Sequence, residues 1–196
     1  MTDRSVPSAP TVPDAHRQAK YQVRFDWAAE GARSVAADAD VVVWVDALGD
    51  GTIVPSAPAI ADLPGTGAVI AAGLTNPAAV AAWALAEQVR LGRRALISII
   101  AAGGSTPAGA TRFAVEDLLA AGAVVDALAS LGIDYSSPEA AAACAAFTGL
   151  RGAVAHLLTA SVSGQELVAT GIAPAEVAPA GRVGTVDEVV VLRPAG

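Results

Sequence analysis

The apolar positions of this chain change their period along its length, and these changes predict alternating strands and helices. Continuous apolar runs predict buried strands at residues 40–46 (DVVVWVD), 68–72 (AVIAA) and 95–100 (ALISII). Alternation predicts a first strand at residues 21–27, and a further apolar run predicts a last strand at 186–192. Helical patterns with start and stop signals lie between them, at residues 28–37, 77–90, 113–131, 138–147, 151–160 and 163–171.

Two of these helices have the same start signal. Asn76 precedes Pro77, and Ser137 precedes Pro138, so that a capping side chain stands before a proline at the first helical position. Strands that alternate with helices predict an α/β fold, a mostly parallel sheet with helices on both faces. No strand pattern interrupts residues 113–170, which predicts an α-rich C-terminal half.

The polar and proline-rich segments set the expected domain limits. Residues 1–20 contain prolines, serines and charges, and we expect a flexible N-terminal tail there, followed by a single α/β domain over 21–196. Residues 53–67 hold three prolines and two glycines and predict no regular structure.

Composition narrows the possible functions. With hydrophobic residues at 54% and aromatics at only 4%, the core must be built from alanine and valine at close approach. A net charge of −7 without a basic stripe argues against nucleic acid or an anionic membrane as partner. We find no apolar signal segment and no uninterrupted apolar run of membrane-span length, and expect a cytoplasmic protein. An alanine- and valine-rich surface is compatible with a homodimer.

Few residues carry metal or nucleophile chemistry. Cys144 is the single cysteine, which excludes an intrachain disulfide and a thiolate metal site. His16 lies in the polar tail and His156 in a helical pattern, so the histidines have no metal-ligand spacing. The remaining candidates are carboxylates.

The helix predicted from Phe113 carries an unusual acidic pair. At about 100° per residue, Asp117 falls in the middle of its apolar face, whereas Glu116 falls well outside that face. A carboxylate among apolar residues must be hydrogen-bonded, paired, metal-bound or protonated. One interpretation is that Asp117 bonds to free N–H groups of the first turn or to Arg112. The other is that it binds a cation or a polar substrate at the sheet edge.

Two further features lie at the predicted carboxyl ends of strands, where open α/β sheets bind ligands. Asp46 ends the strand 40–46, in the position of a nucleophile, base or Mg²⁺ ligand, or of a residue that merely caps the following turn. Gly103, Gly104 and Ser105 form a loop that either binds an anion or serves as a flexible connection. With Asn76 at a second helix start, these residues suit a Mg²⁺-assisted reaction on a phosphate.

The same segments resemble the 2-phosphosulfolactate phosphatase family, whose members are Mg²⁺-dependent enzymes of the coenzyme M pathway and their bacterial relatives. The resemblance is carried by residues 23–27 with 31–33, 39–48 with Thr52, 70–76 with 79–81, 100–103, 113–124, 137–140 and 163–167 with Gly171. The resemblance implies a Mg²⁺-dependent phosphoric monoester hydrolase that acts on a small phosphorylated sulfonate or hydroxy acid. It implies catalytic and metal-binding roles for Asp46 and Asp117, and substrate-binding roles for Asn76, Gly103, Gly104, Ser105 and Glu116.

The chain also departs from this family. Members have a longer middle between the segments of Asp46 and Ala68, with motifs that hold phosphate and sulfonate groups, and only the proline-rich residues 53–67 stand there in this sequence. Gly49, Asp50 and Gly51 replace the family's polar residues after the strand acid. An alternative function follows from these losses: a shortened, catalytically inactive relative that binds a small ligand or a protein.

Overall fold

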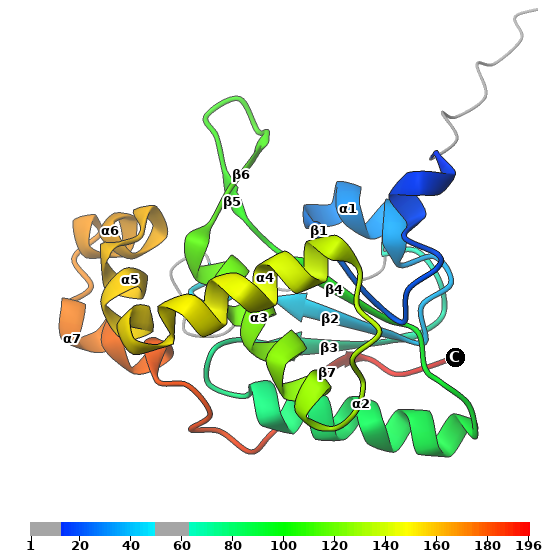
Figure 1. Cartoon of the computed structure of the whole chain (residues 1–196). Helices are drawn as coiled ribbons and strands as arrows, with labels where there is room; N and C mark the ends of the chain where they lie inside the picture. Colours follow the sequence, from blue (N-terminus) through cyan, green and yellow to red (C-terminus); the bar gives the residue numbers. More distant parts are fainter. Residues whose placement is uncertain (1–12, 50–62) are drawn as a thin grey trace, which may run out of the picture.

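A central sheet of five strands organises the chain (Figure 1). The structure is a computed structural model that describes residues 13–49 and 63–196. The strands lie in the order β1-β4-β2-β3-β7. Their bounds are β1 Val23–Trp27, β2 Val41–Val45, β3 Ala68–Ala72, β4 Ile97–Ala101 and β7 Val191–Arg193. The first four are parallel to their neighbours, and β7 is antiparallel to β3. The predicted fold class is confirmed.

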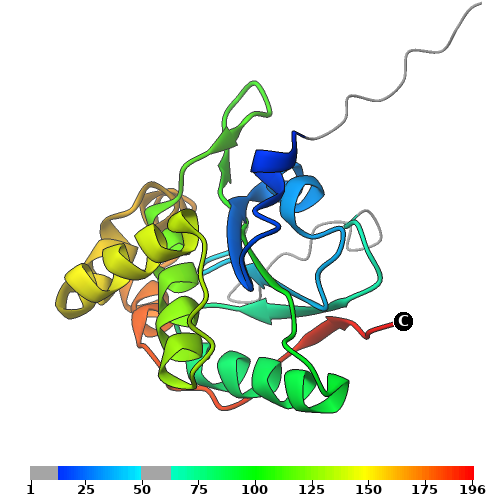
Figure 2. The same cartoon turned by 45° about the vertical axis from the view of Figure 1, so that its right-hand side comes forward.

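Helices cover both faces of this sheet (Figures 1 and 2). On one face, α1 (Ala28–Val35) packs against β1 and β4, over a small core that includes Val42, Trp44 and Ile100. On the other face, α2 (Pro77–Leu91) and α3 (Val115–Ser130) cover the larger core, and α4 (Pro138–Leu150) packs on α3. Every residue of β2, β3 and β4 is buried, which explains their unbroken apolar runs.

The helix α3 is enclosed on nearly all sides at its N-terminal half, because it lies between the sheet, α2 and α4. Glu116 and Asp117 are each only 3% exposed. The prediction that Glu116 lies outside the buried face is therefore wrong, since a helix packed on several sides has no solvent face there. Phe113 was also placed wrongly, because α3 begins two residues later and Phe113 is 58% exposed.

Small residues allow α3 and α4 to approach closely, as the alanine-rich composition predicts. A Cβ added at Gly122 of α3 would lie 2.1 Å from the carbonyl oxygen of Ala143 in α4. The start of α4 is also as predicted, because the Ser137 side chain accepts a hydrogen bond from the N–H of Ala140 at 3.1 Å.

The rest of the C-terminal half is helical and lies beyond α4 (Figure 1). It contains a 3₁₀ turn at Arg151–Ala153, α5 (Val154–Ala160), α6 (Val162–Ala169), α7 (Pro174–Val177) and a 3₁₀ turn at Ala178–Gly181. The single helix predicted over 151–160 is thus a 3₁₀ turn followed by α5. The predicted last strand over 186–192 is shorter and later, since only Val191–Arg193 pair with β3.

Two other segments of the chain, around Gln18 and Tyr135, cover the outer edge of β1. The Gln18 side chain, just after a 3₁₀ turn at Asp14–Arg17, donates to the Phe25 carbonyl at 2.8 Å and accepts from the Phe25 N–H at 3.0 Å. The N–H of Val23 donates to the carbonyl of Tyr135 at 3.0 Å. The part of the predicted tail nearest the domain therefore lies against β1, and an edge strand without free main-chain groups resists pairing with other chains.

One helical stretch in the described residues is long and apolar enough to cross a membrane by length and composition. It runs from Pro138 to Ala169 and consists of α4, the 3₁₀ turn, α5 and α6. A single stretch of this kind is weak support for a membrane segment.

Candidate functional site at the carboxyl edge of the sheet

The carboxyl ends of β2, β3 and β4 bring most of the predicted site residues to one edge of the sheet. Asp46 directly follows β2, Gly103 follows β4, and Asn76 lies between β3 and α2. The strands β2 and β4 are neighbours in the sheet, so the turns that follow them lie side by side. This arrangement is the one that the parallel strands predict.

The carboxylate of Asp117 joins these two turns. One of its oxygens, Oδ1, accepts a hydrogen bond from the N–H of Ala47 at 2.8 Å, and Oδ2 accepts one from the N–H of Gly103 at 2.9 Å. The position of Asp117 on the apolar face of the helix correctly predicted that its carboxylate needs partners. They are neither first-turn N–H groups of its own helix nor Arg112, but main-chain groups of two separate turns.

Asp46 and Asp117 influence each other electrostatically. Burial, reinforced by the charge of Asp46, raises the pKa of Asp117 to about 8, against the opposing effect of the hydrogen bonds from Ala47 and Gly103. A second negative charge beside a buried carboxylate makes its ionisation unfavourable. A cation between the two carboxylates would relieve this repulsion.

Asp46 is partly buried, and one of its oxygens stabilises the turn that follows β2. The N–H of Gly49 donates to Asp46 Oδ1 at 2.6 Å, while the Asp46 N–H donates to the Ala72 carbonyl of β3 at 3.1 Å. Asp46 therefore caps the turn after β2, which is one of the two roles that the sequence predicts for it. Asp50, Gly51, Thr52 and most of the proline-rich segment lie outside the described residues.

Glu116 is buried beside Asp117 in the first turn of α3. Its negative charge adds to the effects that raise the pKa of Asp117. Three acidic residues, Asp46, Glu116 and Asp117, thus lie near the start of α3.

Asn76 does not cap α2 with its side chain, contrary to the start signal. Its Oδ1 accepts a hydrogen bond from the N–H of Gly73 at 2.9 Å, and its Nδ2 donates to the carbonyl of Glu188 at 3.2 Å. The side chain thus fixes the β3–α2 turn to the segment before β7. A substrate-binding role for Asn76 stays a prediction.

The glycine-rich loop after β4 forms a short hairpin, and substrate binding by Gly103, Gly104 and Ser105 stays a prediction. Gly104–Ser105 form β5, which pairs with β6 at Thr111–Arg112, and the hairpin projects from the body (Figure 1). The N–H of Gly103 already donates to Asp117, so it is not available for an anion. The short strands form because Thr106 and Ala110 close the turn between them, with a bond from the Thr106 N–H to the Ala110 carbonyl at 2.9 Å.

Arg112 is a feature of this edge to which sequence reasoning gave no role of its own. Its guanidinium donates to the Phe113 carbonyl at 3.0 Å and to the Ser163 hydroxyl of α6 at 3.2 Å. It also lies against Gly104, where an added Cβ would come within 2.5 Å of Nη2. The only sequence signal is an arginine just before the acidic helix, beside a glycine-rich loop.

A family model for 2-phosphosulpholactate phosphatase matches residues 57–194, which is more than half of the chain. The chain belongs to the 2-phosphosulpholactate phosphatase family. No curated protein matches the chain. The family consists of phosphatases, so this chain belongs to a family of hydrolases.

The matched range of the 2-phosphosulpholactate phosphatase family divides the candidate site. Asn76, Gly103, Glu116 and Asp117 lie inside the match, as do Gly104 and Ser105. Asp46 and the motifs over residues 23–48 lie before it. The family match therefore covers the turns around β3, β4 and α3, while Asp46 enters the site through its place in the fold.

Phosphatases of this family are typically metal-dependent, so the carboxyl edge must be tested as a cation site. Among the described residues, no three His, Cys, Asp or Glu side chains cluster closely enough to hold a metal ion by themselves. Mg²⁺ is usually bound by one or two carboxylates, with water and substrate phosphate as its other ligands. The oxygen-only pair of Asp46 and Asp117, which repel each other, fits this kind of site.

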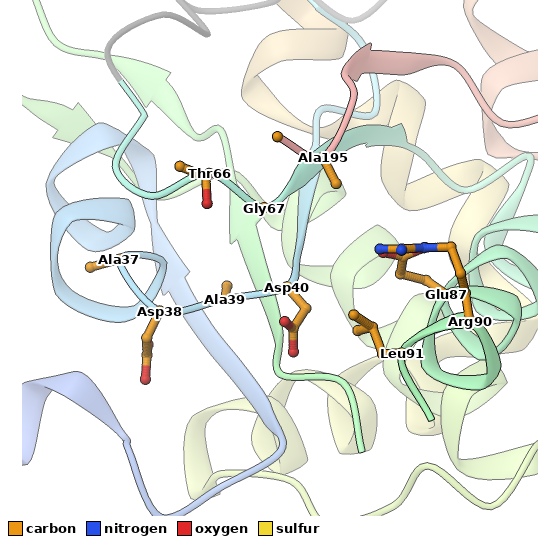
Figure 3. A pocket seen from close by; sticks show the side chains of 11 residues that line it. Ala37, Asp38, Ala39, Asp40, Thr66, Gly67, Glu87, Arg90, Leu91 and Ala195 are labelled. Atoms are coloured by element: carbon orange, nitrogen blue, oxygen red, sulfur yellow. The ribbon is translucent and has the colours of Figure 1, made fainter. Parts of the chain in front are cut away.

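A hollow of about 210 Å³ lies at the opposite, amino end of β2 and β3 (Figure 3). Charged groups line it, but each is already paired, either within the lining or with a group outside it. Arg90 bonds Glu87 at 2.5 and 2.8 Å, and Asp40 bonds Arg93, outside the lining, at 2.7 and 2.8 Å. The first pair lies within α2, and the second joins the segment before β4 to the start of β2, so we assign the hollow no function.

Proposed function

We propose that this chain is a Mg²⁺-dependent phosphoric monoester hydrolase that acts on a small phosphorylated sulfonate or hydroxy acid in the cytoplasm. Membership of the 2-phosphosulpholactate phosphatase family supports the reaction class. The observation that carries the proposal is the pair formed by Asp46 and Asp117. The buried carboxylate of Asp117 joins the turns that follow β2 and β4, and the charge of the more accessible Asp46 acts on it.

The two acids have different roles in this proposal. Asp46 provides an oxygen ligand for the cation at the carboxyl end of β2. Asp117 holds the turns after β2 and β4 in place through Ala47 and Gly103, and its carboxylate helps to balance the charge of the cation. Mg²⁺ bound there would polarise the phosphoryl oxygens and lower the pKa of a bound water.

Main-chain N–H groups are the remaining polar features that a phosphate could use. The N-terminus of α2, a helix of fifteen residues, starts at this edge with Pro77, and Asn76 holds the turn before it. Glu116 places a further acidic residue beside Asp117, which favours a cation over a bare anion at this position.

The test is hydrolysis of 4-nitrophenyl phosphate and of 2-phosphoglycolate by the purified chain, with Mg²⁺ and with EDTA. We expect turnover that requires Mg²⁺ and that falls about 100-fold or more in Asp46→Asn. The matched control is Asp134→Asn, an exposed acid after α3, which should keep full activity. Equal rates for Asp46→Asn and the wild type would remove Asp46 from the reaction.

The alternative, a non-catalytic binding module, is favoured by one observation. Both oxygens of Asp117 already accept main-chain hydrogen bonds, which suits a purely structural residue. This alternative expects a folded protein without Mg²⁺-dependent turnover on either substrate. A Mg²⁺-dependent rate that a single site substitution abolishes would exclude it.

A further inference from the structure

The guanidinium of Arg112 is held against the hairpin that follows β4. It lies on Gly104, and the preceding residue, Gly103, donates its N–H to Asp117. Asp117 and Arg112 therefore contact adjacent residues of the chain, Gly103 and Gly104. Gly104 has no side chain, which leaves the space that the guanidinium occupies; a Cβ there would lie 2.5 Å from Nη2 and 2.9 Å from Cζ.

The arginine is fixed but not saturated. A guanidinium has five N–H donors in a planar fork. Among the described residues, two of the donors are used, one by the Phe113 carbonyl and one by the Ser163 hydroxyl. The side chain is 25% exposed, so part of it is accessible to solvent.

The carboxylate nearest to Arg112 is a weak competitor. Glu166 Oε2 lies 4.0 Å from Nη2, beyond hydrogen-bond distance, and the Glu166 side chain is 68% exposed. An exposed ion pair of this length contributes little free energy. An incoming oxyanion can therefore displace Glu166 without breaking a strong contact.

We propose that Arg112, with the hydroxyl of Ser163 beside it, forms the subsite for a second oxyanion of the substrate, a carboxylate or a sulfonate. The planar fork matches two oxygens of such a group. The inference rests on the proposed function for the identity of the substrate. It assigns the reacting phosphate to the side of Asp46 and Asp117 and the non-reacting anion to Arg112.

The first test measures binding without catalysis. Sulfoacetate carries a carboxylate and a sulfonate but no phosphate ester, and its affinity can be measured by isothermal titration calorimetry. We expect Arg112→Gln to raise the dissociation constant about tenfold or more, and Arg112→Lys to raise it less, because lysine keeps the charge but loses the fork. Arg33→Gln, an exposed arginine of α1 at 3.6 Å from Glu30, is the matched control and should bind as the wild type does.

The outcomes separate the subsite from a merely structural arginine. No binding to the wild type, or equal affinity of the wild type and Arg112→Gln, would overturn the proposal. If Arg112→Gln does not fold, as judged by circular dichroism, Arg112→Lys decides the question in its place. A loss of thermal stability in Arg112→Lys without a change in affinity means that the arginine only joins the hairpin to α6.

The second test uses the reaction itself. Arg112→Lys should raise KM for 2-phosphoglycolate, which has a carboxylate besides its phosphate, and leave KM for 4-nitrophenyl phosphate and both kcat values unchanged. A parallel rise of KM for both esters would contradict the assignment. If neither ester is hydrolysed, the proposed function fails, and the calorimetry still decides whether Arg112 binds the anion.

Discussion

The most informative residue of the chain is Asp117, because the sequence shows that it needs partners but not which ones. Its place in an apolar arc can be read from helical spacing alone. Its partners, Ala47 and Gly103, lie 70 and 14 residues away and meet only when β2 and β4 pair in the sheet. For Glu116 the helical spacing gave a wrong prediction, because spacing alone does not show that several elements enclose the start of α3.

The first prediction concerns the stability that Asp117 contributes at different pH values. Its pKa is about 8 in the folded protein and near 3.8 in an unfolded chain. A raised pKa means that folding favours the protonated form, so this stabilisation is full below about pH 4 and is lost as the pH rises through 8. In metal-free buffer, Asp117→Asn should remove this part of the pH dependence.

The same substitution should also have a cost that does not depend on pH. An amide has one acceptor oxygen instead of two, so one of the two main-chain N–H groups loses its partner, at a cost of about 1–3 kcal/mol. Urea unfolding at pH 5 and pH 8.5 measures both effects, with Asp134→Asn for comparison. An unchanged difference between the two pH values would show that Asp117 does not titrate in this range.

At the scale of elements, the contact between α3 and α4 depends on the absence of a side chain at Gly122. We predict that Gly122→Ala destabilises the protein by about 1–3 kcal/mol, because the added Cβ would press on the main chain of Ala143, which cannot rotate away. The measurement is the free energy of unfolding in urea.

Gly149 of α4 provides a control of opposite sign. An added Cβ there meets no atom within 4 Å. Gly149→Ala should therefore stabilise the protein by about 0.5–1 kcal/mol through the higher helix propensity of alanine. If both substitutions stabilise, the two helices do not pack as closely as described.

At the scale of the whole molecule, the sequence predicts what depends on local pattern. The buried runs at β2, β3 and β4 and the cap at Ser137 follow from residue order, because strand period and capping are local properties. The turn chemistry of residues 103–112 did not follow, since a glycine-rich loop and a short hairpin have similar composition. The capping role of Asn76 was also predicted wrongly, because its partner Glu188 lies 112 residues away in the chain.

The role of Arg112 shows the same limit for the candidate site. A lone arginine before a helix has no pattern that distinguishes it from a solvated surface charge. Only the folded chain places it between Gly104 and Ser163, beside the turn that Asp117 holds. The position of Asp46 and Asp117 at one edge of the sheet can thus be predicted from sequence, and the surroundings of Arg112 cannot.

The central claim is that Asp46 and Asp117 act as one unit in a phosphatase site, and a double-mutant cycle tests it most directly. The measurement is kcat/KM for 2-phosphoglycolate with saturating Mg²⁺ in the wild type, Asp46→Asn, Asp117→Asn and the double variant. Groups that act together lose their contribution once, so we predict that the double variant is no more than about threefold slower than the slower single variant. Losses that multiply, or a single variant with wild-type activity, would contradict the account.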